Sequence, residues 1–318
     1  MSVLLSGSLA YDYIMDFPDS FKNHIMPDQL HILNVCFVVN KLEKNFGGTA
    51  GNIAYTMNLL KVTPIILCPL GNDSNDYVDH LNKNKINSDY IPINNKIMTS
   101  SVQITTDKDD NQISAFYAGA GNGAKELKIK SIKETLDLAL ISPNQKEAMI
   151  EHAKECTELN IPFCFDPGQQ ITALSPQELI SLIEQAKFLI GNDYELKLIQ
   201  DKTGWDMNKI LKHVEVVITT LGSKGSLIQS KDQVIEVGVC VPNSVEDPTG
   251  AGDAYRSGFF SAYLQGLNYT TCGQVGAVAA TYAVEHYGTQ NHTFTLDEFK
   301  QRYKESFGET LSLELKNI

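Results

Sequence analysis

Short apolar runs alternate with amphipathic runs along most of the chain, and this alternation predicts a mostly parallel sheet with helices on both faces. The apolar runs end at polar or glycine-containing turns, as strands do. We expect strands at residues 2–9, 62–70, 138–142, 161–166, 188–191 and 214–220. We expect helices at residues 50–60, 144–159, 176–186, 253–265, 271–286 and 296–307. The fold class that follows is α/β.

Two regions depart from this alternation. Residues 34–44 are strand-like, and residues 99–117 form two strand-like runs joined by a polar turn. No helix directly follows either region, so both suit a small antiparallel sheet inserted into the α/β body. Two later runs, 225–229 and 233–241, predict a hairpin because only a short turn separates them. We expect one domain over the whole chain, 1–318, with a β-sheet lid built approximately from segments 12–18, 34–46 and 98–118.

The charge balance is acidic, with 26 lysines and arginines against 38 aspartates and glutamates in 318 residues, a formal net charge of −12. This balance argues against a protein of nucleic acids or membrane surfaces, which needs a basic face. Only Arg256 and Arg302 are arginines, so any phosphate site here lacks a set of arginine forks. Because the sequence has neither a long apolar span nor a basic leader, we expect a cytoplasmic protein without membrane contact.

The six cysteines include no C-x-x-C pair, and most lie in apolar runs. We interpret them as buried free thiols in a reducing compartment rather than as disulfides or zinc ligands. Their positions are 36, 68, 156, 164, 240 and 272. The seven histidines include no H-x-x-x-H pair, so we expect no histidine-based metal site.

The strongest chemical signal is Asp-Pro-Thr-Gly-Ala-Gly-Asp-Ala-Tyr at residues 247–255, between a predicted strand and a predicted helix. A Gly-Ala-Gly turn at a helix N-terminus aims unpaired backbone N–H groups at one point, and the helix dipole assists them. Such a nest binds an anion without arginine. Asp253 lies beside it, placed as a general base; the simpler alternative is an acidic N-cap. Tyr255 stands where a dinucleotide fingerprint has its third glycine, so that fingerprint is excluded.

A second glycine-rich motif, at residues 46–54, precedes a predicted helix. Its paired glycines let the backbone approach a ligand closely. Asn52, on the first turn, has a donor and an acceptor for a vicinal diol. Asp12, just after the first strand, is a carboxylate that can accept hydrogen bonds from sugar hydroxyls. Read alone, the motif is also compatible with an ordinary turn, and Asp12 with an exposed loop acid.

Three further motifs follow strand-like runs. Asn192 and Glu195 are three apart on a predicted helix, so they share a face and can hold the waters of a Mg²⁺ ion; a solvated helix start is the alternative. The turn at 219–225 suits polyphosphate contact, although it is equally compatible with an ordinary β-turn. Residues 119–124 fit G-x-G-x-x-A, but no β-α-β unit follows them, so we do not interpret them as a nucleotide fingerprint.

Together, and in this order along the chain, the motifs resemble those of the ribokinase-like (PfkB) family of sugar and nucleoside kinases. Residues 47–52 look like the family's N-terminal signature and 247–253 like its C-terminal one. Residues 220–225 and 192–195 are similar to its ATP-loop and magnesium motifs. The resemblance implies a Rossmann-like ribokinase fold with a small β-sheet lid. It also implies transfer of the γ-phosphate of ATP to a primary hydroxyl.

The resemblance also implies site roles. Asp253 would take the proton from the attacking hydroxyl. Charge on the transferring phosphoryl group would be stabilised by the backbone N–H groups of Gly250, Ala251 and Gly252. Ribose hydroxyls would be held by Asp12, Gly48 and Asn52. A nucleobase could stack on an aromatic residue of the lid or its neighbourhood, namely Phe116, Tyr117 or Phe37, although for any one of them a place in the hydrophobic lid core is the more ordinary role.

The nucleotide side of the site follows from the same resemblance. ATP would be lined by Thr220, Gly222 and Gly225. Mg²⁺ would be organised through water by Asn192 and Glu195. We predict that Arg256 reaches the phosphates or braces the anion turn, the alternative being a helix-surface position. The family resemblance also implies a monovalent cation such as K⁺ near segments 247–249 and 283–288.

Three segments narrow the choice of phosphoryl acceptor. Residues 48–52, 104–117 and 287–292 look most like the corresponding segments of adenosine kinases and related bacterial nucleoside kinases. We therefore predict an ATP-dependent kinase of the adenosine 5′-hydroxyl, an activity of purine salvage, giving AMP and ADP. The alternatives are a ribokinase-type sugar kinase and a catalytically silent nucleoside-binding protein. A nicotinamide dehydrogenase is disfavoured by the missing fingerprint. The expected partners are a small-molecule acceptor and ATP, with the chain a monomer or homodimer.

Overall fold

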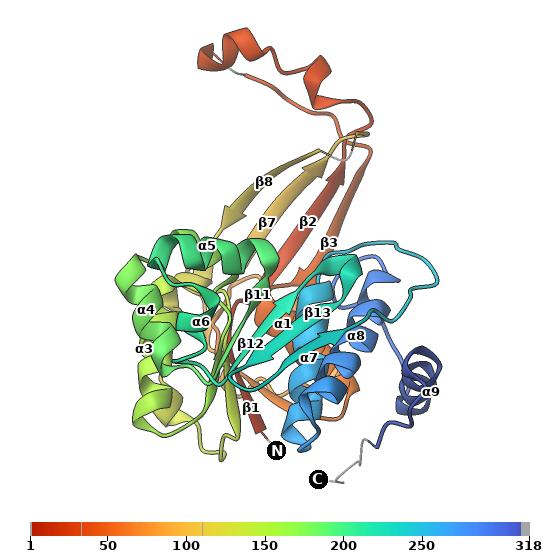
Figure 1. Ribbon diagram of the computed structural model, residues 1–318. Coiled ribbons are helices and arrows are strands. Elements are labelled where there is room, and N and C mark those ends of the chain that lie inside the picture. The colour runs from red at the N-terminus through yellow and green to blue at the C-terminus, as the bar shows by residue number, and fades with distance from the viewer. Residues whose placement is uncertain (1, 33, 110, 313–318) are drawn as a thin grey trace.

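A computed structural model describes residues 2–32, 34–109 and 111–312, and Figure 1 shows an α/β body with a separate sheet rising from it. Within those residues the main sheet has eight strands in the order β14-β13-β12-β11-β10-β9-β1-β4. Their bounds are Val234–Val237, Ser226–Ser230, Val216–Thr220, Phe188–Asn192, Phe163–Phe165, Leu138–Ile141, Ser2–Ser6 and Thr63–Ile66. The six strands from β12 to β4 are parallel, and β13 and β14 add the antiparallel hairpin that the sequence predicts.

Helices cover both faces of this sheet, as the near-continuous apolar strands require. Successive strand residues point to opposite faces, so Leu189 joins one core cluster and Ile190 the other. One face carries α1 Thr49–Leu59, α2 Asn75–Lys83, α7 Ala251–Leu264, α8 Tyr269–Val284 and α9 Leu296–Phe307. The other carries α3 Lys146–Glu158, α4 Pro176–Gln185, α5 Asp193–Thr203 and α6 Met207–Ile210. Among the helices described, none combines the length and apolar character needed to cross a bilayer.

The second sheet is built from segments far apart in the sequence, in the order β3-β2-β7-β8. The bounds are Lys41–Gly47, Ala10–Asp16, Ser100–Thr106 and Gln112–Tyr117. We call these four strands the lid sheet; it stands above the α/β body in Figure 1. The β7–β8 hairpin was predicted, but the expectation of a wholly antiparallel sheet is wrong, because β2 and β7 run parallel. The first strand also ends at Ser6, since the chain there turns into β2.

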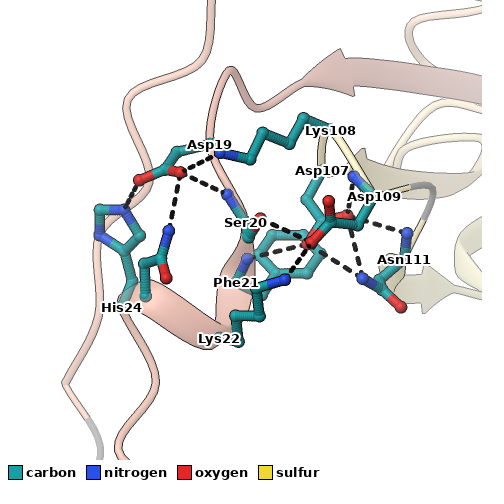
Figure 2. Close-up of polar contacts among 10 residues, drawn as sticks. Asp19, Ser20, Phe21, Lys22, His24, Asp107, Lys108, Asp109 and Asn111 are labelled. Atoms are coloured by element: carbon teal, nitrogen blue, oxygen red, sulfur yellow. Dashed lines mark hydrogen bonds and ion pairs between the residues drawn. The ribbon is translucent and has the colours of Figure 1, made fainter.

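A protruding segment, residues 17–32 and 34–40, connects β2 to β3 and extends beyond the lid sheet (Figure 1). It contains two short 3-10 helices, Phe21–Asn23 and Pro27–Ile32. Polar contacts join its base to the β7–β8 turn, as Figure 2 shows. They include Lys108 Nζ to Asp19 at 3.0 Å, Lys22 Nζ to Asp109 at 2.8 Å and the Phe21 N–H to Asp107 at 2.8 Å.

The protruding segment corrects three expectations. The strand predicted at 34–44 begins only at Lys41, because Phe37 packs against Phe17 and Phe21 instead of entering a sheet. That packing also places Phe37 at the far end of the lid, so the interpretation of Phe37 as a nucleobase-stacking residue is wrong. Cys36 lies here and is exposed, whereas the other five cysteines are buried as expected; none forms a disulfide in the described part of the chain.

Candidate active site

The anion turn, Gly250 to Gly252, begins helix α7 at the carboxyl edge of the main sheet, where open α/β folds bind ligands. Gly250 has φ of 81°, a left-handed conformation that favours glycine. Asp247 shapes the turn by accepting backbone N–H groups from Thr249 at 2.9 Å and Gly288 at 3.1 Å. No side chain caps α7, so the alternative reading of Asp253 as an N-cap is wrong.

Asp253 lies on the first turn of α7 and faces helix α1. Its carboxylate accepts a hydrogen bond of 2.8 Å from Asn52 Nδ2. Burial raises the pKa of Asp253 from 3.8 to about 6, while the charge of Arg256 and the Asn52 hydrogen bond limit the rise. A carboxylate with that pKa is mostly ionised at neutral pH and still basic enough to take a proton in a transition state.

The side chain of Asn52 makes more hydrogen bonds within the protein than we expected from the sequence. Its Oδ1 accepts from Thr289 Oγ1 at 2.8 Å and from Gln290 Nε2 at 3.0 Å. The expectation that donor and acceptor both face a diol is therefore wrong, and one Asn52 N–H remains for a ligand. Sequence reasoning missed Thr289 and Gln290 as individual residues; the only signal was the polar run at 287–292.

Asp12 lies on β2, where the lid sheet meets the body. Its pKa is raised from 3.8 to about 7, first by burial and then by the charges of Asp253 and Asp247. Asp12 is therefore close enough to be repelled by these two acids, which are distant from it in the sequence. Carboxylates with raised pKa values in a cleft can accept protons or hydrogen bonds from a polar ligand, so this group is a candidate functional site.

A cavity of about 600 Å³ opens between the lid sheet and the body, which we call the acceptor cavity. Asp12, Gly48 and Asn52 line one part of it, and Phe116 of β8 lines it from the lid. Phe116 is 63% exposed, so it is free to contact a ligand. Tyr117 is not among the lining residues. A further part of the lining consists of neutral amide side chains, namely Asn122, Asn144, Gln145, Gln169 and Gln170.

A second cavity, of about 430 Å³, lies on the other side of the anion turn, and we call it the nucleotide cavity. The predicted nucleotide residues Thr220, Gly222 and Gly225 all line it, together with Ala251 and Gly252. Most of its remaining lining is apolar and includes Val239, Pro242, Val245, Ala277, Ala280 and Val284. Ala251 and Gly252 of the anion turn thus face a mostly apolar cavity, while Asp253, which follows them, is linked to the polar acceptor cavity through Asn52.

Arg256 lies beneath the anion turn and is only 8% exposed, so the alternative of a helix-surface position is wrong. Its Nε and Nη2 each lie 2.6 Å from an oxygen of Asp166. A Cβ placed on Gly252 would come within 2.7 Å of Nη1, which puts the guanidinium directly against the turn. Sequence reasoning missed Asp166, although an acid directly after the buried strand β10 is a usable signal.

Asn192 and Glu195 form a reciprocal cap at the start of α5. Asn192 Oδ1 accepts the Glu195 N–H at 2.7 Å, and Glu195 Oε2 accepts the Asn192 N–H at 2.8 Å. The cap leaves one carboxylate oxygen of Glu195 for a ligand, and neither residue lines the two cavities. In the described ranges no group of three or more His, Cys, Asp or Glu side chains is placed to hold a metal directly.

Comparison with known proteins shows which family and which solved structures this chain is similar to. The chain matches the pfkB family carbohydrate kinase model over residues 24–295. It is 33% identical to the nucleoside kinase of Methanocaldococcus jannaschii over 301 residues, which cover 93% of this chain and 94% of that protein. The solved structure of Burkholderia thailandensis nucleoside kinase with inosine superposes with a TM-score of 0.89 at 33% identity, covering 97% and 99% of the two chains. Thermotoga maritima ribokinase, at 22% identity and a TM-score of 0.79 over 96% and 99%, shares the fold.

Proposed function

We propose that this chain, which belongs to the pfkB carbohydrate kinase family and is an ATP-dependent kinase, phosphorylates the 5′-hydroxyl of adenosine or a related nucleoside. The acceptor cavity carries the proposal. Asp12 and Asn52 provide sugar-binding groups beside Asp253, and the aromatic ring of Phe116 and the neutral amides extend the cavity beyond them. A free pentose would leave the amide-lined part unfilled, whereas a heterocyclic base has donors and acceptors that amides match. The likeness to two nucleoside kinases supports the same acceptor.

In this proposal Asp253 takes the proton of the 5′-hydroxyl as that oxygen attacks the γ-phosphorus of ATP; the bond between the γ-phosphorus and the β,γ-bridging oxygen breaks, and ADP leaves. The backbone N–H groups of Gly250, Ala251 and Gly252 stabilise the charge that develops on the transferring group. Fixed amide dipoles need no rearrangement during the reaction. This arrangement explains how an acidic chain with two arginines can act on phosphates.

On the acceptor side, Asp12, Gly48 and the free N–H of Asn52 bind the ribose hydroxyls, and Phe116 stacks on the base. On the other side, Thr220, Gly222 and Gly225 bind ATP in the nucleotide cavity, with Arg256 directed at its phosphates from below the turn. A lid that closes over the acceptor excludes water, which would otherwise compete for the phosphoryl group.

The donor set at the start of α5 fits Mg²⁺, which prefers oxygen ligands and keeps several waters. Since the reciprocal cap occupies one oxygen of each residue, Asn192 and Glu195 would hold the ion through water. When bound, Mg²⁺ neutralises charge on the ATP phosphates. The hydrogen bond between Asp247 and Gly288 brings the segments 247–249 and 283–288 together, which supports a monovalent cation such as K⁺ at that junction.

The direct test is ADP release with Mg-ATP across adenosine, inosine, other nucleosides, ribose, fructose and fructose 6-phosphate. We expect the highest kcat/KM with a purine nucleoside and the lowest values with the sugars and the sugar phosphate. Activity confined to a free sugar would replace the nucleoside proposal with the ribokinase-type alternative. Tight nucleoside binding without turnover would favour the catalytically silent binder.

A further inference from the structure

We infer that Gln290 is a positioning residue that orients the Asn52 amide so that its N–H group, and not its oxygen, faces Asp253. The inference rests on the proposed role of Asp253 as the base. It assigns a function to the segment after α8, which touches neither the phosphoryl group nor ATP in the proposal above.

The orientation follows from a chain of hydrogen bonds that starts at a backbone carbonyl. The carbonyl oxygen of Gly47 only accepts, so Tyr77, whose Oη lies 2.7 Å away, donates its single proton there. The atom of Gln290 that lies 3.0 Å from Tyr77 Oη must then be a donor, which identifies it as Nε2. The same Nε2 lies 3.0 Å from Asn52, whose facing atom must be the acceptor Oδ1. The remaining end of the Asn52 amide, Nδ2, therefore donates to Asp253.

His80 fixes the other end of the Gln290 amide. Its Nε2 lies 3.0 Å from Gln290 Oε1, which only accepts, so the proton of this imidazole is on Nε2. Burial lowers the pKa of His80, which favours the neutral ring. Gln290 is thus held by a donor on its oxygen and by acceptors on its nitrogen, and a flip of its amide would break all three contacts.

This chain of hydrogen bonds from Gly47 through Tyr77 and Gln290 to Asn52, which we call the relay, is closely packed and shielded from water. Tyr77, Gln290 and Asn52 are 0%, 3% and 6% exposed, so water does not compete for their hydrogen bonds. A Cβ at Gly51 would collide with the Tyr77 hydroxyl and approach Gln290 Nε2. The glycine next to Asn52 therefore leaves the space that the relay occupies, which gives this motif position a physical reason.

A reversed Asn52 amide would place Oδ1 against the Asp253 carboxylate. The two oxygens repel, so Asp253 would move or bind a proton more tightly. Gln290→Glu favours this reversal, because an ionised carboxylate accepts a hydrogen bond from Asn52 instead of donating one to Oδ1. The remaining donor to Oδ1 is then Thr289 Oγ1, whose single proton is shared with the Phe46 carbonyl. Misplacement of a reacting group by about 1 Å costs on the order of 10²-fold in rate.

The test compares Gln290→Glu with Gln233→Glu, a matched change of charge at an exposed turn. Each variant is assayed with whichever acceptor the wild type uses best, so the identity of the acceptor is tested separately. We expect Gln290→Glu to lower kcat by about 10²-fold and to shift the acidic limb of the kcat/KM profile to higher pH, with little change in the KM for ATP. Gln233→Glu should behave as wild type. An unshifted acidic limb with kcat within about twofold of wild type would overturn the inference.

A second variant distinguishes loss of the Asn52 orientation from a folding defect or the loss of packing. Gln290→Met keeps the side-chain volume but leaves Asn52 free rather than reversed, so we expect a smaller loss of kcat than with glutamate. Equal losses, or a greater loss with methionine, would identify a packing role and overturn the relay. The pKa of Asp253 can also be measured without an activity assay. For a given background, the unfolding free energy is compared with and without Asp253→Asn, and the pH at which the two values diverge reports that pKa. That pH should be higher in the Gln290→Glu background, where Arg256, Asp166 and Glu195, which also act on Asp253, are unchanged.

Discussion

The guanidinium of Arg256 and the carboxylate of Asp166 form a two-point ion pair, with both nitrogen–oxygen distances at 2.6 Å, beneath the anion turn. The residues are 90 positions apart and both are buried. The pair holds a positive charge against the backbone that we propose for phosphate binding. Because burial of the pair costs hydration, its benefit lies in that placement as much as in stability.

Arg256→Met should destabilise the protein by about 3–5 kcal/mol, because it leaves the Asp166 charge buried and unpaired. The double variant Arg256→Met/Asp166→Leu should recover most of that free energy in urea unfolding, since no lone charge remains. It should nevertheless keep a raised KM for ATP and a lowered kcat. Recovery of wild-type kinetics in the double variant would mean that the guanidinium has no part in phosphate binding.

Asp253→Asn should lower kcat by about 10²–10⁴-fold, the range associated with a general base. Nucleoside and ATP binding, followed by calorimetry, should change little, because asparagine can still accept the hydrogen bond from Asn52. Asp232→Asn, on an exposed turn, is the matched control. Near-normal turnover by Asp253→Asn would remove Asp253 from the role of base.

The pH dependence of kcat/KM should show an acidic limb near pH 6, since the pKa of Asp253 is raised to about 6 and the base must be ionised. Activity should rise through that pH and level off above it. Arg256→Lys should leave the limb near the same pH, whereas loss of the positive charge should move it upward. Initial rates at several fixed pH values, with salt held constant, measure the position of the limb in each variant.

Stability should respond to pH in the opposite direction. The folded pKa values of Asp12 and Asp253 are raised to about 7 and about 6 from 3.8. Their contribution to stability is complete below pH 4 and is lost as pH rises through 6 and 7. Asp12→Asn should therefore stabilise the ligand-free protein relative to wild type at pH 8 and much less at pH 5. Denaturant unfolding at both pH values measures the difference; equal differences would contradict the raised pKa.

Phe116→Ala should raise the KM for the nucleoside about tenfold, because stacking of a base on an aromatic ring contributes about 1–3 kcal/mol. The KM for ATP and the melting temperature should hardly change, since the ring is 63% exposed. Phe116→Tyr keeps the stacking face and should retain the wild-type KM. A nucleoside KM unaffected by the alanine change would assign Phe116 to the lid surface only.

Much of the fold was predictable because its signals are local. Apolar strand runs, the hairpin at β13 and β14 and the helix at 296–307 depend on neighbours a few residues away. The strand placed at 34–44 failed for the opposite reason. Its apolar residues have the composition of a strand, but Phe37 finds aromatic partners at positions 17 and 21 that no short pattern reveals.

The features of the candidate site also fall into those that local sequence predicted and those that depend on contacts between distant segments. Patterns within single segments were enough to predict that a glycine turn begins a helix and that Asp253 follows it, and the composition showed that few arginines are available. The hydrogen-bond and ion-pair partners of these residues depend on the three-dimensional fold. Asp166 reaches Arg256 across 90 residues, and Thr289 and Gln290 reach Asn52 across 237 and 238. Contacts at such separations depend on how strands and helices pack, so no local propensity encodes which side chains meet.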